Sequence, residues 1–285
     1  MKRTFVCLCT LVLLVSCSRP GTLPPADVLQ KASQAAQSLA SAHFALQASV
    51  HGQTDFLGGV TDGTVNAEGD MQDGGNQLSL SVKAHVEQAL ANTTFDVDGD
   101  VLVAGQHQTY IKLRSLSISP TSDILPPALV TQMLNQWWKL PSGASGSALG
   151  TQVAPDPELL KMQTQVVSVS ADHGLTNLDG STVYFYDVTI DHAKLATYLS
   201  EIAKREGMPE PQIDKLSLYT AKGQIWIDAD TFFIRKISWS IESTDPKKPA
   251  QISITAQITK QNEPVNIVPP QDSQPFQISL PSLVH

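Results

Sequence analysis

The sequence predicts an α+β domain built around one bent antiparallel sheet. Most of its length consists of stretches in which apolar and polar residues alternate, which is the period of half-buried strands. Short turns containing Gly and Asn separate these stretches, with no helical pattern between them, and this favours an antiparallel meander. Two longer segments instead have an apolar stripe at helical spacing. The 285 residues are enough for one large domain.

The first helix is expected over residues 26–41, with Asp27 as its N-cap. One face of this helix is apolar, so we expect it to be buried against the sheet. That face consists of Val28, Leu29, Ala32, Ala35, Ala36 and Leu39.

A series of strands follows this helix. In the first of them, Phe44, Leu46 and Val50 alternate with polar or small residues. Turn motifs such as Asp179-Gly180 separate the later ones. These further strands are expected near 60–71, 77–88, 93–103, 107–114, 164–174, 181–190, 213–220, 223–229, 232–243 and 250–261.

Helical patterns interrupt the strands at two points. Pro126-Pro127 precede a short amphipathic helix near 128–134. Asp191 is the expected N-cap of a second long helix, which ends near Gly207. The remaining features are a Ser/Gly loop at 143–147, a helical turn at 157–163 and a Pro-rich tail after 263.

The beginning of the chain has the features of an export signal. Lys2 and Arg3 precede an apolar run from Phe5 to Val15, which is shorter than the roughly 20 residues of a membrane-spanning helix. The alternatives are an ordinary signal peptide with a cysteine near its cleavage site and a buried N-terminal strand.

The end of this segment, Leu14-Val15-Ser16-Cys17, resembles the lipobox of bacterial lipoproteins. In that family the cysteine thiol carries a diacylglycerol, and the peptide is cut just before it. The resemblance implies lipidation of Cys17. We therefore expect residues 1–16 to be a signal peptide that is removed, residues 17–25 a lipidated N-terminus and Pro-containing tether, and residues 26–285 a single domain.

Composition limits the possible partners. The formal net charge is −8, so the chain repels nucleic acid and anionic membrane surfaces, and no nucleic-acid partner is expected. The three cysteines are Cys7, Cys9 and Cys17. Two of them lie in the segment expected to be removed and the third is expected to carry lipid. The mature domain would then hold no disulfide and no thiolate metal site.

Motifs for covalent chemistry are absent from the sequence. It contains no G-x-S-x-G and no phosphate-binding glycine loop, and its seven histidines are scattered singly, without zinc spacing. Asp96, Asp98 and Asp100 could face one hard cation, but the Gly and the distal Glu of a calcium loop are missing. We read them as a solvated turn. No catalytic residue, metal or cofactor is expected, and the protein is not expected to be an enzyme.

The apolar strand faces suggest a binding cavity. A strongly bent antiparallel sheet has a concave face that its own side chains do not easily fill, and the two helices could cover it. Either an apolar cavity remains between helices and sheet, or the two pack together without a void. The residues expected to line such a cavity are Phe44, Leu46, Val50, Ile225, Ile227, Phe233, Ile237 and Trp239.

Several short motifs resemble one family, the LppX/LprG lipoproteins of the LolA-like superfamily, best known from mycobacteria. The motifs are residues 26–29 and 38–44, the strand Tyr110-Ile-Lys-Leu113, the segment Trp137-Trp138-Lys-Leu-Pro141 and the W-I-D hairpin at 223–236. The resemblance implies a half-barrel of roughly 11 strands with helices over its concave face. It also implies a cavity for acyl chains, such as a C16 chain, and transport of lipids or glycolipids through the cell envelope. This chain departs from the family in its acidity and its Ser/Gly loop.

The expected function is thus that of a lipid carrier held by Cys17 to the outer side of the cell membrane or to the outer membrane. We expect a monomer that binds a lipid or glycolipid and works with an envelope transporter. The alternative is a structural or signalling envelope lipoprotein that uses the same sheet to bind a protein partner and has no lipid cavity.

Overall fold

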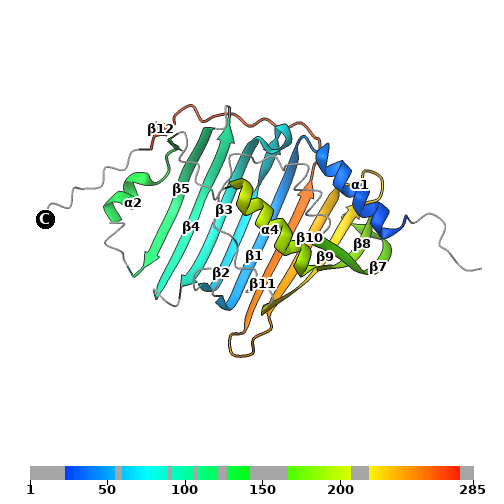
Figure 1. The fold of residues 1–285 in the computed structure, drawn as a ribbon. Coiled ribbons are helices and arrows are strands. Elements are labelled where there is room, and N and C mark those ends of the chain that lie inside the picture. The colour runs from blue at the N-terminus through cyan, green and yellow to red at the C-terminus, as the bar shows by residue number, and fades with distance from the viewer. Residues whose placement is uncertain are drawn as a thin grey trace, which may run out of the picture.

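In the computed structural model the chain forms one 12-stranded, mostly antiparallel sheet (Figure 1). The structure describes residues 23–54, 60–88, 92–105, 108–120, 127–141, 166–206 and 218–276. The strand order is β12-β6-β5-β4-β3-β2-β1-β11-β10-β9-β8-β7, so each half of the chain contributes neighbouring strands. No helix in the described part of the chain is long and apolar enough to cross a membrane.

The first half of the sheet is a simple meander. Its strands are β1 (Ala42–Thr54), β2 (Val60–Gln72), β3 (Gln77–Gln88), β4 (Thr93–Ala104) and β5 (Gln108–Ser119). Each strand pairs with the one before it because a chain that alternates apolar and polar residues reverses most easily at short turns. The turn between β2 and β3 is the short 3₁₀ helix η1 (Asp73–Gly75), in which Gly74 has φ +63°.

The second half repeats this arrangement. Its strands are β7 (Val167–Leu178), β8 (Ser181–Ile190), β9 (Tyr219–Asp228), β10 (Ile234–Ser243) and β11 (Ala250–Thr259). Strand β11 then pairs along its whole length with β1, and this joins the two halves. Figure 1 shows the blue strand β1 beside the orange strand β11 in the middle of the sheet.

Two very short strands extend the sheet beyond β5. Strand β6 (Trp138–Lys139) pairs antiparallel with β5, and β12 (Gln274–Pro275) pairs parallel with β6. Trp138 also packs edge-on against Phe276, at 5.9 Å between ring centroids. The C-terminal segment is therefore attached to the sheet at the edge opposite to β7.

The described part of the chain contains three α-helices beside the sheet: α1 (Pro25–Gln37), α2 (Pro127–Met133) and α4 (His192–Glu206). Helix α4 begins where the sequence predicts, because Asp191 Oδ1 accepts hydrogen bonds from the backbone N–H groups of Ala193 and Lys194. These bonds also hold the pKa of Asp191 below its ordinary value. The expected N-cap of α1 was wrong, since the capping position is Pro24 and Asp27 lies in the first turn.

The two faces of the sheet have different chemistry. On one face apolar side chains continue across strands, as where Phe44 of β1 opposes Ile258 of β11 and Trp239 of β10 opposes Ile254. Helix α1 packs on this face through Val28 and Ala32, which are 0% and 2% exposed. The other face carries polar side chains. The two faces follow directly from the alternation in the sequence.

Several boundaries differ from the predicted ones, and one of them is the end of β7, which continues to Leu178 rather than ending at 174. Helix α1 ends at Gln37 rather than near residue 41, because the chain leaves the helix at Ser38. Strand β5 continues to Ser119 rather than ending at 114. The strands expected at 213–220 and 223–229 are one strand, β9, within the described residues. The expected loop at 143–147, the helical turn at 157–163 and the whole segment 1–22 lie outside the described residues.

Candidate ligand cavity

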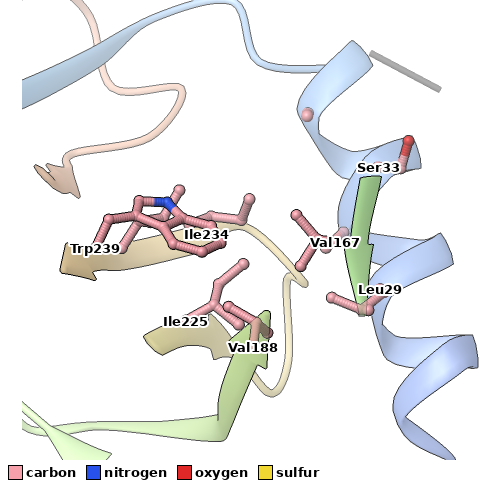
Figure 2. A pocket seen from close by; sticks show the side chains of 10 residues that line it. Leu29, Ser33, Val167, Val188, Ile225, Ile234 and Trp239 are labelled. Atoms are coloured by element: carbon pink, nitrogen blue, oxygen red, sulfur yellow. The ribbon is translucent and has the colours of Figure 1, made fainter. Parts of the chain in front are cut away.

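An apolar cavity of about 160 Å³ lies between helix α1 and one end of the sheet (Figure 2). Helix α1 forms one wall, and strands β7 to β10 form the other. Its lining is apolar except for the hydroxyl of Ser33. The lining residues are Leu29, Ala32, Ser33, Ala36, Val167, Val188, Ile225, Ile234, Ile237 and Trp239.

Helical spacing brings the α1 residues to the cavity. Ala32 and Ser33 follow Leu29 by three and four residues, and Ala36 follows them by four and three, so all four lie along one side of the helix. Two of them are alanine and one is serine, and their small side chains leave space that larger ones would fill. In Figure 2 Leu29 lies on α1 close to Val167 of β7, on the side of the cavity opposite the strands β8 to β10.

The strand residues reach the cavity through their register. Ile225 of β9 lies opposite Ile237 of β10, and Val188 of β8 lies opposite Gly223 of β9. Trp239 of β10 is also opposite Gly223, and its ring lies directly over that glycine. Because Gly223 has no side chain, the large indole can lie flat on the sheet and form the floor of the cavity beside Ile225.

A cluster of tyrosines lies in the same core. Tyr186 is fully buried next to Val188 and Ile225, and its ring lies 6.3 Å from that of Tyr184. Its hydroxyl has no hydrogen-bond partner among the residues that the structure describes. Burial, together with the nearby charge of Asp172, raises the pKa of Tyr186 well above its ordinary value. A phenol held neutral in this way is not an activated nucleophile or base.

The sequence-based cavity residues fall into two groups. Ile225, Ile237 and Trp239 line the cavity. The other five do not line it. Phe44, Leu46 and Val50 are on the apolar face of β1, where they oppose residues of β11. Ile227 is 0% exposed within the packed core, and Phe233 lies in the turn after β9, where its carbonyl accepts a hydrogen bond from the N–H of Asp228.

Sequence reasoning expected helices to cover the cavity but did not name the helix residues that line it. Leu29, Ala32 and Ala36 belong to the stripe expected to be buried, but nothing in the spacing indicates that their small size leaves a void. Val167, Val188 and Ile234 were also missed as lining residues. The alternation of apolar and polar residues in their strands predicts that these side chains point inward, but it does not indicate which part of the sheet the helix covers. Cys17, the expected lipidation site, lies outside the described residues.

The polar face of the sheet is organised by ion pairs between strands. Arg114 of β5 donates hydrogen bonds to Asp98 and, at 2.6 Å, to Asp100, while Asp96 lies 2.7 Å from His85 of β3. The carboxylates considered as a possible cation site are thus engaged by basic side chains. Within the described segments no group of three or more His, Cys, Asp or Glu is arranged to hold a metal ion.

The size of the cavity limits what it can hold. Pockets for drug-sized ligands occupy roughly 300–1,000 Å³, and this one occupies about 160 Å³. It is therefore large enough for part of an alkyl chain or for one small ring, but not for a whole lipid. With an apolar lining and no charged group, it can provide burial and shape rather than covalent chemistry.

Comparisons with known proteins find similarity at the level of structure. No family model matches the chain, and no curated protein matches it. The lipoprotein LppX of Mycobacterium tuberculosis is similar over 86% of this chain and 100% of its own, with 19% identity and a TM-score of 0.41. LprF of Mycobacterium bovis is similar over 88% of this chain and 99% of its own, with 16% identity and a TM-score of 0.44.

Proposed function

We propose that this protein is an exported envelope lipoprotein, anchored through acylated Cys17, that binds alkyl chains of lipids or glycolipids beneath α1 and carries them through the cell envelope. The observation that supports this proposal is the cavity, which is lined almost entirely by apolar side chains of one helix and four strands. Hydrocarbon is the ligand that such a lining accepts without leaving buried polar groups unpaired.

The affinity of the cavity as it stands is modest. A cavity of about 150 Å³ in another protein holds benzene, so there is room here for roughly six carbon atoms. At about 0.8 kcal/mol per buried CH₂ group, six carbons contribute about 5 kcal/mol before ordering costs. That free energy corresponds to a dissociation constant between millimolar and micromolar. Tight binding of a longer chain therefore requires a larger cavity.

Movement of α1 would enlarge it. The helix is held to the sheet by a narrow stripe centred on Val28 and Ala32, and it has no side-chain hydrogen bond at its N-cap. Displacing the helix would expose more of the apolar face of strands β8 to β10, where Ile225, Ile237 and Trp239 lie. In this proposal α1 and the other helices cover the concave face of a half-barrel and open to admit the chain.

A matched pair of substitutions on α1 tests the proposal. Ala36→Phe places a ring in the cavity, whereas Ala26→Phe places the same ring at an exposed position in the first turn of the same helix, before the cavity begins. Each protein is purified from a bacterial host that acylates it, and co-purified lipid is measured by native mass spectrometry alongside binding of a fluorescent fatty acid. The proposal expects loss of both signals in Ala36→Phe and their retention in Ala26→Phe.

The small volume also favours a second candidate function, in which the sheet binds a protein partner and the cavity is a packing defect. That function expects no lipid in the wild-type protein and the same probe signal in Ala36→Phe and Ala26→Phe. Either of these results would reject the lipid-binding proposal.

A further inference from the structure

A second hollow lies on the polar face of the same strands that line the apolar cavity. Its volume is about 480 Å³, within the usual range of ligand sites. The backbones of Val188 and Gly223 belong to its floor, and Val188 also borders the apolar cavity. The two spaces are therefore back to back, separated by a single layer of sheet.

Strand register arranges the polar side chains of this hollow in two rows. Asp187 of β8, Gln224 of β9 and Ser238 of β10 are directly opposite one another. Two residues along each strand, Thr189, Lys222 and Ser240 form the second row. Neighbouring strands are about 4.8 Å apart and alternate residues on one strand about 7 Å apart. The hollow therefore presents six polar groups on a regular grid.

The groups on this grid keep hydrogen-bonding capacity for a ligand beyond the contacts that they already make. Ser238 Oγ lies 3.2 Å from Thr255 Oγ1, and Ser240 Oγ donates to Glu242 Oε1 at 3.5 Å, so each hydroxyl has capacity left. Gln224 Nε2 donates to Asp187 Oδ1 at 3.0 Å, and Asp187 Oδ2 lies 2.9 Å from His173 Nε2. These two contacts lower the pKa of Asp187, so its carboxylate is ionised and can accept further hydrogen bonds. Lys222 is exposed, and no ion pair to it occurs among the residues that the structure describes. Its ammonium group is the cation available to a ligand.

Other ligand classes fit this hollow poorly. An alkyl chain would gain little from a lining of hydroxyl, amide and charged groups. The nearby aromatic rings do not form a stacking platform, because Phe185 and Trp226 stack on each other at 4.8 Å. Their remaining faces are covered by His173 at 4.4 Å and by the Lys236 ammonium at 4.9 Å. Recognition would therefore rely on hydrogen bonds.

We propose that this polar hollow binds a sugar that carries a negatively charged substituent. Sugar hydroxyls both donate and accept hydrogen bonds, which matches a grid that mixes Asp187, Gln224 and the hydroxyls of Ser238, Thr189 and Ser240. The negative substituent pairs with Lys222. This site lies on the face opposite α1, so it does not depend on the lipid-binding proposal and remains if that proposal fails.

Isothermal titration calorimetry on the full-length protein tests this site with glucuronic acid, glucose and inorganic phosphate as separate probes. Glucuronic acid is expected to bind saturably, and glucose about tenfold more weakly, because a hydrogen bond to a charged group contributes about that factor. Lys222→Ala is expected to weaken glucuronic acid binding about tenfold. Gln224→Ala is expected to weaken the binding of both sugars.

The matched control is Lys83→Ala, which removes an exposed lysine from the same polar face but on β3, at a distance from the hollow. It should leave binding of both sugars unchanged. Three results would each overturn the proposal: no saturable binding of either sugar, equal binding of phosphate and glucuronic acid, or equal losses in Lys222→Ala and Lys83→Ala.

Discussion

Replacing Gly223 by alanine is expected to move Trp239 and to reshape the cavity under α1. A Cβ atom at position 223 would lie 2.5 Å from Cε3 and 2.6 Å from Cζ3 of the indole ring. These distances are far shorter than any non-bonded carbon–carbon contact, and the rigid indole ring cannot deform to lengthen them. The indole must therefore tilt away from β9 toward α1, into the space that the cavity occupies.

The cost can be estimated from two opposing effects. Forcing an extra carbon into a packed site typically destabilises a protein by about 1–3 kcal/mol. Replacing glycine within a strand recovers about 0.5–1 kcal/mol of backbone entropy. The expected net loss in the free energy of unfolding is about 1–2 kcal/mol, which lowers the melting temperature by about 2–8 °C for a domain of this size.

Two measurements on Gly223→Ala separate the change in stability from the movement of Trp239. Urea denaturation gives the change in the free energy of unfolding, and ¹⁹F NMR of protein labelled with fluorotryptophan reports the environment of Trp239. The resonance is assigned by its absence in Trp239→Leu. We expect this resonance to shift and those of Trp137 and Trp138 to stay in place, because these residues lie at the other end of the sheet.

The double variant that combines Gly223→Ala with Trp239→Leu supplies the control. In a Trp239→Leu background the smaller side chain no longer covers position 223, so the added methyl group should cost little or even stabilise the strand. The reasoning is refuted if Gly223→Ala is equally destabilising in both backgrounds, or if it leaves both stability and the Trp239 resonance unchanged.

Three further predictions concern polar contacts of the fold. Arg114→Met should destabilise the protein by about 1 kcal/mol in urea denaturation, since it leaves the two carboxylates of Asp98 and Asp100 close together without their cation. Arg114→Lys should recover only part of this stability, because lysine lacks the planar fork of the guanidinium group. The hydrogen bond to Asp96 raises the pKa of His85, so its contribution to stability is fully present below the ordinary histidine pKa and is lost as pH rises through the folded value. The difference in melting temperature between wild type and His85→Gln should accordingly be larger at pH 5.5 than at pH 8.5, and a constant difference would contradict this. Asp191→Ala removes the N-cap of α4, so hydrogen exchange of the Ala193 and Lys194 amides should accelerate, whereas Asp191→Asn should keep most of their protection.

Local patterns in the sequence predict most of the sheet. The alternation around Phe44 to Val50 and the turn at Asp179-Gly180 place their strands correctly, because burial of one face of an antiparallel sheet requires a period of two. The prediction of strand boundaries fails around Gly223. The sequence predicts separate strands at 213–220 and 223–229, with the second one beginning at this glycine. The glycine instead lies within the strand, where the ring of Trp239, sixteen residues further along the chain, requires its lack of a side chain.

The cavity was harder to predict, because its position depends on where a helix meets a sheet. Apolar and polar residues alternate in the same way in β1 and in β9. This pattern places both Phe44 and Ile225 on the apolar face of the sheet. Only the packing of Val28 and Ala32 against the strands around Tyr186 decides that Ile225 lines the cavity and Phe44 does not. Such a contact between distant segments leaves no periodic signal in either of them.

The pairing of β1 with β11 has a consequence for how the chain acquires its structure. Strands β1 to β5 form from successive hairpins, as do the pairs β7–β8 and β9–β10, and these hairpins close short loops at little entropic cost. The central pair, by contrast, joins residues 42–54 to residues 250–259. The last long strand to be synthesised therefore enters the middle of the sheet rather than its edge. Until it does, β1 and β10 both expose unpaired backbone groups, and the slow step of folding is expected to be the closure of this pair.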